Sequence, residues 1–527
     1  MSHVEAESVD RESSIALLIE GLRSPNAYPG IEADSVEMRE THISWVFLVG
    51  DFAFKLKKPV HTPFLDYSTL PKRKHFCEEE YRLDQRYAAD LYLGVVPITV
   101  TAEGPKVDGE GQPVEYAVKM RRFPDEALLS ERMVAGTLTT DEVFALAERI
   151  ADFHQSAKRL DVKAGKDPLG SIDLIYRNAA DNLRDLHDAV GGQSARTVRV
   201  LGEWTNAYFE DNRRVFSQRA ANGFIRECHG DMHLANIVHW NDQLIPFDGI
   251  EFNDAFRWID VISDAAFVAM DFAARDRLDL SRSFINAYLD RTGDHASLSV
   301  LRWYLVYRAL IRAKVAAIRA GQPGSSDPQR QAAMKDCEDH VELAYRFSLR
   351  DEAALWITHG VSGSGKTTIS ELVVQRRGAI RLRSDTERKR HFGLSPTDRP
   401  TACQKADLYS ECANHATYAR LRRMARCILR AGLPVVIDAT FLLQEERETF
   451  KSLAGREGAT FGILDCRADM QTLRQRIADR MARDSDASDA DLTVLEHQLS
   501  CYEELSDSER SHVVEIPSPA TFIGAMR

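Results

Sequence analysis

The chain has 527 residues, a formal net charge of −12, 44% hydrophobic residues and 28% charged residues. A chain of this length exceeds what one hydrophobic core normally organises, so we expect two or three domains. The acidic balance argues against a general binder of nucleic acid or membrane surfaces, because such proteins are usually basic. It leaves room for a local basic groove.

The cysteine pattern and the N-terminus favour the cytoplasm. The eight cysteines are scattered and form no C-x-x-C pair, which predicts reduced thiols and neither disulfides nor zinc ligands. The polar, acidic start MSHVEAESVDRESS has no signal-peptide character. No apolar run reaches the ~18 residues that a membrane helix needs. We therefore expect a cytoplasmic protein without membrane contact.

The first third of the chain is predicted to be rich in strands. The expected strands lie at 43–49, 52–56, 95–100 and 116–120; a Gly50-Asp51 hairpin joins the first two, and a glycine-rich turn at 104–111 separates the last two. Helices are expected at 13–22, 72–89 and 140–159, the last with Thr140 or Asp141 as its N-cap.

The rest of the chain changes from helical to alternating. Helical spacing continues to residue 350, with strand-like interruptions at 224–240 and 244–252 and a linker at 321–328. Strands at 355–359, 379–382, 433–438 and 460–466 then alternate with helices, which predicts a parallel sheet. We place domains at 1–325 and 351–527, joined by a linker helix at 326–350.

A glycine-rich octapeptide, G-V-S-G-S-G-K-T, occupies residues 360–367 between a predicted strand and a predicted helix. The glycines allow backbone N–H groups to converge on a phosphate, and the helix N-terminus adds a favourable field. We expect Lys366 to reach the β- and γ-phosphates of ATP and Thr367 to ligate Mg²⁺. The residues predicted to bind the nucleotide are Gly360, Ser362, Gly363, Ser364, Gly365, Lys366, Thr367 and Thr368.

Two carboxylates that follow predicted strands also support phosphoryl transfer at this site. The apolar strand ending in Asp438 would deliver a second metal ligand. Asp385 follows another strand and faces the ligand crevice of such a sheet, where it can take the proton of an acceptor hydroxyl. A helix N-cap formed by Ser384 or Asp385 is the alternative.

Four arginines occur at positions 474, 476, 480 and 483, and Arg476 and Arg480 share one helical face. We predict a lid on which these two arginines neutralise transition-state charge, with residues 484–491 as its tip. A solvated basic face is the alternative.

Taken together, G-V-S-G-S-G-K-T, R-S-D-T-E-R-K, V-I-D-A-T-F and the R-x-x-x-R helix resemble the bacterial P-loop kinase-like group over about residues 355–515. That group includes polynucleotide kinase 5′-hydroxyl domains, chloramphenicol phosphotransferase, zeta-toxin and gluconate-kinase-type proteins. The resemblance implies an ATP-dependent phosphotransferase and leaves its acceptor open.

A second chemical motif lies in the first half, in H-G-D-M-H-L-A-N-I-V from residue 229 and L-I-P-F-D-G-I-E-F from residue 244. Asp231 can accept the proton of an acceptor hydroxyl, and Asn236 and Asp248 can hold Mg²⁺ on nucleotide phosphates. A zinc site formed by the histidines at positions 229, 233 and 239 is an alternative without standard spacing. A purely structural turn is another.

This motif resembles the aminoglycoside-phosphotransferase family, which has a protein-kinase-like fold, over about residues 40–320. The resemblance implies a small β-rich lobe, a hinge at 115–120, a larger helical lobe, and a strand lysine paired with a helix glutamate that grips the α- and β-phosphates. We assign that pair to Lys55, in preference to Lys57 on the same strand face, and Glu80. No G-x-G-x-x-G precedes Lys55, and Asp-Gly-Ile-Glu stands where protein kinases have Asp-Phe-Gly.

The sequence therefore predicts a two-domain protein of α/β and α+β class. Its N-terminal part is expected to be a protein-kinase-like bilobal fold, and its C-terminal part a P-loop NTPase with a parallel sheet flanked by helices. The expected activity is an ATP-dependent phosphotransferase with an alcohol group on a small molecule as acceptor and two ATP/Mg²⁺ sites.

Two other functions stay open. One is a regulatory or nucleic-acid-end-processing NTPase with a pseudokinase N-terminal domain, which the net charge disfavours and the basic run at 381–390 favours. The other is a toxin-like kinase acting on a nucleotide sugar.

Overall fold

The computed structural model describes residues 14–62, 64–160, 169–322, 326–396, 398–483 and 491–514; at residues 402, 403, 406 and 480–483 it describes the backbone alone. The chain forms two compact units. The first comprises Met1–Leu146, Phe153–Ile175 and Ser217–Asp264, and the second Ala147–Asp152, Tyr176–Phe216 and Ala265–Arg527. This division does not follow chain order, and the linear domain boundaries at residues 325 and 351 stay a prediction.

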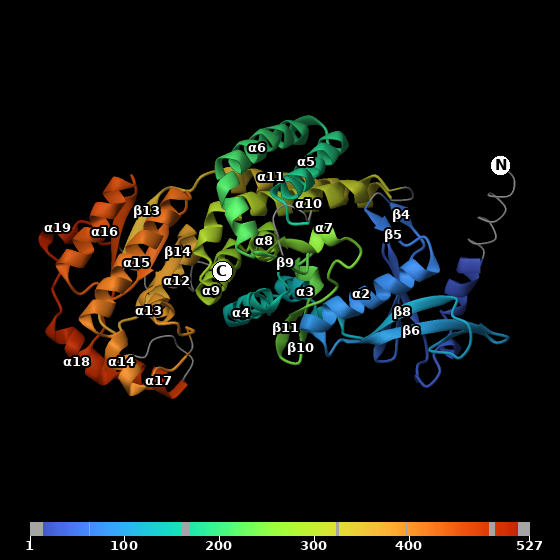
Figure 1. The fold of residues 1–527 in the computed structure, drawn as a ribbon, viewed down its shortest axis with the longest axis horizontal. Coiled ribbons are helices and arrows are strands. Elements are labelled where there is room, and N and C mark those ends of the chain that lie inside the picture. The colour runs from blue at the N-terminus through green and yellow to red at the C-terminus, as the bar shows by residue number, and fades with distance from the viewer. Residues whose placement is uncertain are drawn as a thin grey trace. The chain divides into compact units, whose positions relative to one another are not determined.

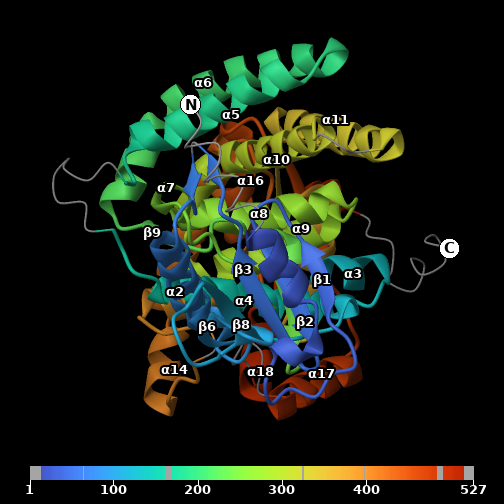
Figure 2. The same cartoon turned by 90° about the vertical axis from the view of Figure 1, so that its right-hand side faces the viewer.

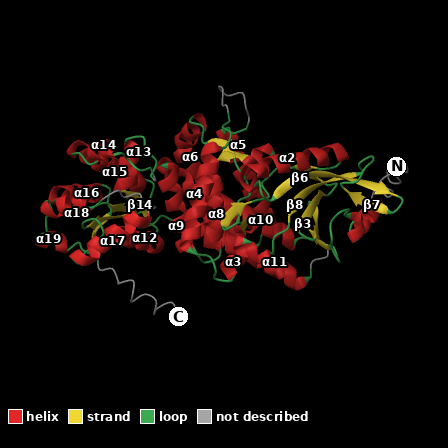
Figure 3. Cartoon of the chain, turned by 90° about the horizontal axis from the view of Figure 1, so that it is seen from below, coloured by secondary structure: helices red, strands yellow, loops and turns green. Residues whose placement is uncertain are grey.

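The first unit contains a six-stranded antiparallel sheet with the order β1-β2-β3-β8-β6-β7 (Figure 1; strands in yellow in Figure 3). Its strands are β1 (Glu37–Glu40), β2 (Ser44–Val49), β3 (Phe52–Lys57), β6 (Tyr92–Thr101), β7 (Gly104–Val107) and β8 (Glu115–Arg121). The four predicted strands and the hairpin at Gly50, whose φ is +53°, are confirmed. The predicted turn at 104–111 was wrong in part, because its first half pairs with β6 as β7.

Both faces of this sheet are covered by apolar side chains. On one face, Phe47 and Phe54 pack in a buried cluster. On the other, helix α2 (Leu70–Ala88) places Cys77 against Val118 of β8. The alternation of side chains along β3 and β8 produces this two-sided burial. It also carries Lys55 and Lys57 toward the face that α2 covers, where both contact Glu80 of that helix.

Helix α4 (Thr140–Ser156) begins at the predicted residue, but its N-cap lies one residue before the predicted one. Thr139 is the N-cap: its hydroxyl accepts the N–H of Glu142 at 3.3 Å, and the Glu142 carboxylate accepts the Thr139 N–H at 2.9 Å. The expectation of Thr140 or Asp141 was wrong because this reciprocal capping box needs a glutamate three residues after the cap. Only Thr139 has one.

The candidate site of the first unit lies on short ribbons. These are β9 (Ile225–Glu227), paired with β12 (Trp258–Asp260), and β10 (Ile237–Trp240), paired with β11 (Gln243–Pro246). The smaller elements of this unit are η1 (Pro25–Ala27), β4 (His61–Thr62), β5 (Leu65–Asp66), η2 (Asp125–Ala127), α3 (Leu129–Val134), η3 (Leu234–Asn236) and α7 (Asp254–Arg257).

The second unit begins with long helices. They are α5 (Ile172–Ala189), α6 (Gly192–Ala221), α8 (Val261–Ala274), α9 (Leu278–Thr292), η4 (His295–Ser297), α10 (Leu298–Ala320) and α11 (Asp327–Ser348). Helices α5 and α6 lie side by side, as do α10 and α11 (Figure 2). One apolar cluster that includes Leu186, Phe267 and Leu310 joins them.

The same unit contains a four-stranded sheet with the order β14-β15-β13-β16, in which every pair is parallel. Its strands are β13 (Ala354–His359), β14 (Ile380–Arg383), β15 (Val435–Asp438) and β16 (Thr460–Asp465). Its helices are α12 (Lys366–Arg377), α13 (Ser384–His391), α14 (Ala402–Leu408), α15 (Glu411–Arg430), α16 (Gln444–Arg456), α17 (Met470–Arg483), α18 (Leu492–Ser500) and α19 (Asp507–Arg510). The predicted parallel sheet is confirmed. All four residues of β15 are buried, as a strand covered on both faces requires.

Two further features concern the thiols and the helices. Among the described cysteines, those at positions 77, 228, 337, 412, 427, 466 and 501 form no disulfide. None of the helices in the described part of the chain combines the length and the apolar character that crossing a membrane would demand.

Candidate functional site

The glycine-rich octapeptide forms a loop between β13 and α12. Gly360, Gly363 and Gly365 have φ values of +146°, +83° and +97°, a region that residues with a Cβ rarely adopt. At Gly363 a Cβ would stand 3.0 Å from the carbonyl oxygen of Leu473. The loop therefore needs glycine for conformation and for space, as a close phosphate cradle does.

Three contacts hold this loop from inside the second unit. The Lys366 ammonium donates to the Val361 carbonyl at 2.8 Å, the Ser362 N–H donates to Gln498 Oε1 at 2.8 Å, and Arg476 donates to the Gly363 carbonyl at 3.1 Å. The buried Ser364 hydroxyl has no hydrogen-bond partner in the described part of the chain. An orphaned donor beside a lysine in a left-handed loop fits a bound phosphate group.

A cavity of about 540 Å³ opens beside the cradle. Its walls include Thr367 at the start of α12 and Asp438 at the end of β15. The Ser370 hydroxyl donates to the Asp438 carboxylate at 3.2 Å and helps to orient it. Hydroxyl and carboxylate oxygens are the ligands that Mg²⁺ prefers, so the two predicted metal ligands fit the ion. Mg²⁺ held there would neutralise phosphate charge.

Asp385 reaches the same cavity from the first turn of α13. Its carboxylate lies 3.2 Å from Arg388 and is about a quarter exposed. The alternative N-cap role was wrong: the residue before α13 is Arg383, and no side chain caps that end. With the cap excluded, the carboxylate stays available to a ligand in the cavity.

The predicted lid arginines are only partly described. Arg476 lines the cavity beside Gly365, while Arg474 is exposed and does not line it. Arg480 belongs to α17, but its side chain, like that of Arg483, lies outside the described residues. Most of the predicted lid tip, residues 484–490, also lies outside them.

Several cavity residues were missed by sequence reasoning. They share no spacing that a motif search detects, because they come from five different helices or their ends: Arg388, Tyr409, Asn414, Tyr418, Glu446, His497 and Gln498. Arg388 donates to Asn414 Oδ1 at 3.0 Å, and its guanidinium lies 4.9 Å from the ring centre of Tyr409. Burial raises the pKa of Glu446 to about 7, against a hydrogen bond from Tyr418 that lowers it.

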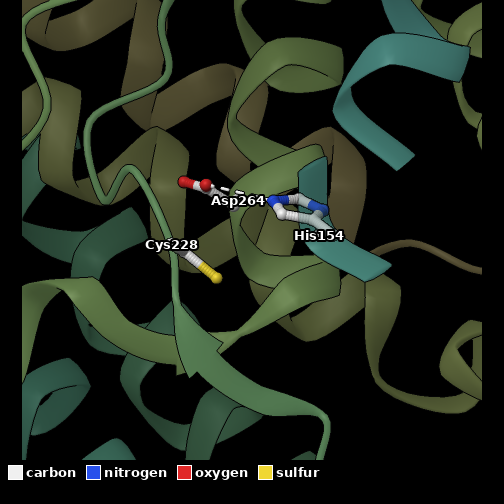
Figure 4. Close-up of side chains that lie close together, drawn as sticks. All are labelled: His154, Cys228 and Asp264. Atoms are coloured by element: carbon white, nitrogen blue, oxygen red, sulfur yellow. Dashed lines mark hydrogen bonds and ion pairs between the residues drawn. The ribbon is translucent and has the colours of Figure 1, made fainter. Parts of the chain in front are cut away.

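In the first unit, Asp231 lies on a loop whose backbone is held by the side chain of Asp264. The Asp264 carboxylate accepts the backbone N–H groups of His229 at 2.9 Å and Gly230 at 3.0 Å, and His154 Nε2 lies 3.2 Å from it (Figure 4). Gly230 has φ +89°, and a Cβ there would stand 2.7 Å from the Phe256 carbonyl oxygen. These contacts fix the backbone immediately before Asp231.

His154, Cys228 and Asp264 form the one buried His/Cys/acid group in the described part of the chain whose atoms lie within 4.8 Å of one another (Figure 4). Because Asp264 already accepts two backbone N–H groups and contacts His154, the group serves as an anchor for the loop. The alternative zinc site was wrong, because His229 uses both ring nitrogens. Its Nε2 lies 2.9 Å from the Phe247 carbonyl and its Nδ1 accepts the Asp231 N–H at 3.2 Å.

Two of the three predicted polar residues of this site, Asp231 and Asn236, contact each other directly. Asn236 Nδ2 donates to the Asp231 carbonyl at 3.0 Å and contacts its carboxylate at 3.4 Å. Asp248 has φ +63°, unusual for a residue with a side chain, and its N–H donates to the Tyr92 hydroxyl at 3.1 Å. Backbone strain of this kind persists where surrounding contacts hold it, often at functional positions.

Lys55 connects this loop to the β-sheet. Its ammonium contacts Glu80 at 2.9 Å and also contacts the Asp248 carboxylate. Lys57 lies deeper, fully buried, and contacts Glu80 at 2.6 Å and Glu251. Burial alone would raise the pKa of Glu80, but the two ammonium groups outweigh it and hold the pKa at about 2. Glu80 is therefore ionised. Of the two lysines that it holds, only Lys55 contacts Asp248.

Asp84 holds the segment that contains Asp248 and Gly249, and unlike Glu80 it is protonated. Its Oδ1 accepts the Gly249 N–H at 3.0 Å and the Tyr87 hydroxyl at 2.6 Å, while its Oδ2 is buried without a partner in the described chain. Burial, together with the charge of Glu80, raises the pKa of Asp84 to about 8. Asp84 thus carries a proton at neutral pH and holds the residue that follows Asp248.

Comparison with known proteins identifies one family match and several relatives. The family described as an AAA domain matches residues 355–505. The uncharacterised protein Rv2004c of Mycobacterium tuberculosis is 31% identical over 464 residues, which cover 88% of this chain and 90% of that protein. A protein of Mycobacterium bovis, Mb2027c, matches to the same extent.

Two solved structures are similar at low identity. The amicoumacin kinase hAmiN, solved with AMP-PNP, Ca²⁺ and Ami, has 11% identity and a TM-score of 0.38, covering 64% of this chain and 96% of that one. A putative kinase from Chloroflexus aurantiacus has 21% identity and a TM-score of 0.23, covering 28% of this chain and 75% of that one.

Proposed function

We propose that this chain, which belongs to the same protein family as Rv2004c of Mycobacterium tuberculosis, is an ATP-dependent phosphotransferase with two nucleotide sites. Each site transfers the γ-phosphoryl group of ATP, with Mg²⁺, to a hydroxyl of a small molecule. The proposed setting is the cytoplasm. The single observation that carries the proposal is the cavity that joins the glycine cradle, Asp438 and Asp385.

In the P-loop site, the proposed roles follow the geometry. Lys366 and the cradle bind the phosphates, while Thr367 and Asp438 hold Mg²⁺. Asp385 takes the proton of the acceptor hydroxyl as the P–O bond to the acceptor forms and the bond to ADP breaks. Arg476, with Arg480 from the same helix, stabilises charge on the transferring group.

In the site of the first unit, Asp231 is the proposed proton acceptor, and Asn236 and Asp248 are the proposed metal ligands. Lys55, oriented by ionised Glu80, binds the α- and β-phosphates. The contact between Lys55 and Asp248 supports this proposal, since it places the phosphate-binding and metal-binding candidates side by side.

The test measures transfer from labelled ATP to a panel of hydroxyl-bearing small molecules. We expect Lys366→Ala to abolish transfer at one site and Asp231→Asn to abolish it at the other, with loss of at least about 100-fold for each, the scale of removing a general base or a phosphate ligand. Arg456→Ala, at an exposed position of α16, is the matched control for the lysine change. Full transfer in the doubly substituted chain contradicts the proposal.

One observation favours a second function for the first unit. The β2–β3 connection is only the Gly50-Asp51 turn, so no glycine-rich loop is available there to cover phosphates. This unit would then bind nucleotide without transferring phosphate. In that case Asp231→Asn leaves all transfer unchanged, whereas Lys55→Met still weakens nucleotide binding.

A further inference from the structure

Glu446 forms part of the wall of the P-loop cavity that also contains Asp385. It lies in the first turn of α16 and is half-buried. No cation pairs with it among the described residues, since the neighbouring Arg447 is engaged by Glu509 at 2.7 Å. A half-buried carboxyl without a cationic partner is costly unless a ligand compensates it.

A hydrogen-bonded chain connects Glu446 to the phosphate cradle. Tyr418 of α15 hydrogen-bonds to Glu446, and its hydroxyl also accepts the Phe441 N–H at 3.2 Å and lies 3.4 Å from the Thr440 hydroxyl. Phe441 has φ +48°, and the Thr440 carbonyl accepts the N–H of Gly360 at 3.0 Å. The position of Glu446 is thus tied to the first residue of the cradle.

Arg388, which also lines the cavity, does not balance the charge of the Glu446 carboxylate. Arg388 is paired with Asp385 at 3.2 Å and with Asn414, so its charge is already balanced. Its Nε, in a side chain that is more than nine-tenths buried, has no hydrogen-bond partner in the described chain. The cavity therefore contains a carboxyl without a cationic partner among the described residues, at Glu446, and Tyr418 lines the cavity as well.

We propose that Glu446 determines acceptor specificity in the P-loop cavity, and that the acceptor carries an amino group, besides its reacting hydroxyl, whose ammonium form binds the Glu446 carboxylate. The ammonium supplies the missing cation and forms a charge-assisted hydrogen bond to the carboxylate. This inference rests on the proposed function of the cavity and narrows its substrate class to amino alcohols.

The protonation of Glu446 predicts how the binding of an ammonium ligand should depend on pH. Burial raises its pKa to about 7; Tyr418 and His415 from α15, Arg447 from its own helix and Arg388 from α13 act in the opposite direction. The carboxylate form grows about tenfold between pH 6 and pH 8. An ammonium ligand should therefore bind more tightly at pH 8, whereas a neutral hydroxyl ligand should show no such dependence.

The experiment uses the full chain with Asp231→Asn, which removes the proposed proton acceptor of the other site, saturated with AMP-PNP and Mg²⁺. Calorimetry compares matched probes: 1-amino-2-propanol with 1,2-propanediol, serinol with glycerol, and trans-4-aminocyclohexanol with 1,4-cyclohexanediol. We expect at least one amine to bind about tenfold or more tightly than its partner, the scale of a charge-assisted hydrogen bond. The preference should grow from pH 6 to pH 8.

Substitutions assign that preference to one carboxyl. Glu446→Gln should abolish both the preference and its pH dependence, and Glu446→Asp should retain part of both. Glu445→Gln makes the same charge change at the exposed neighbouring position and should leave both unchanged. Circular dichroism of each variant identifies any failure to fold, in which case the conservative Glu446→Asp chain decides.

Equal binding within all three pairs, absence of amine binding to the nucleotide-loaded chain, or a preference that survives in Glu446→Gln overturns the inference. A failure of the proposed function looks different, because AMP-PNP would then bind equally well to the chain with Lys366→Ala.

Discussion

Asp84 provides a test of the electrostatics beneath the Asp248 segment. Asp84→Asn keeps an oxygen in place for the Gly249 N–H and the Tyr87 hydroxyl, and replaces a protonated carboxyl by a neutral amide. At low pH both side chains are neutral. The substitution should then have little effect on the stability of the first unit.

The expected magnitude follows from the pKa of Asp84, which is about 8 in the folded chain against an ordinary value of 3.8. Because the folded value is the higher one, the stability linked to this proton is complete below pH 3.8 and is lost as pH rises through 8. The loss is about 1.4 kcal/mol per pH unit in that window. Asp84→Asn removes this dependence, so its advantage over the native chain should grow by about 2 kcal/mol from pH 6 to pH 8, because the slope already falls as pH approaches 8.

Urea unfolding at pH 6, 7 and 8, without nucleotide or divalent ions, measures this effect. Pulse hydrogen exchange of peptides from residues 44–88 reports the first unit separately, which matters because a chain of two units need not unfold in one step. Asp90→Asn, exposed at the end of the same helix region, is the matched control and should follow the native chain. Parallel pH curves for the Asp84→Asn and native chains refute the reasoning.

Three further substitutions have distinct expected outcomes. Gly363→Ala should raise the Kd for Mg·ATP at least about tenfold, since a Cβ is strained at φ +83° and distorts the cradle; calorimetry checks this. Arg447→Met should destabilise the second unit by about 3–5 kcal/mol in urea unfolding, because it leaves buried Glu509 without its cation. Lys57→Met should cost the first unit a similar amount, about 3–5 kcal/mol by hydrogen exchange, because Glu251 loses its buried partner.

Controls for these changes are available in the same elements. Gly455→Ala, where a Cβ would meet open space inside α16, should not alter nucleotide affinity. Arg456→Met and Lys58→Met change exposed or half-buried cations and should each cost less than about 1 kcal/mol. If either control matches its test variant, the argument from buried pairing is wrong for that unit.

Local patterns predicted the elements whose chemistry lies in consecutive residues. The cradle at 360–367 was recognisable because its glycines, lysine and threonine are contiguous and stand between a strand and a helix. Asp231 and Asn236 were proposed as site residues for the same reason, since they lie five residues apart on one loop. The N-cap of α4 was misplaced by one residue, since neighbouring threonines look alike until the reciprocal bonds with Glu142 are seen.

Other residues could not be found by spacing at all. Asp84 reads as one more solvent-facing charge of a polar helix, and only its burial against Gly249 makes it protonated. Tyr418 and Glu446 lie on different helices, 28 residues apart, and meet only where α15 and α16 pack beside the cradle turn. Lys55 and Lys57 are equivalent by alternation, yet only Lys55 contacts Asp248.

The sequence by itself determined that this chain contains a glycine-rich loop after a strand and a parallel sheet in its last third, and it predicted a second loop with candidates for a general base and metal ligands. These are properties of short-range order: backbone conformation, side-chain periodicity and the reach of adjacent residues. Tertiary structure alone decided which lysine reaches Asp248, which carboxyls carry protons and which residues enclose the cavity. Those properties depend on burial and on charges brought together from distant segments, and neither exists before the chain folds.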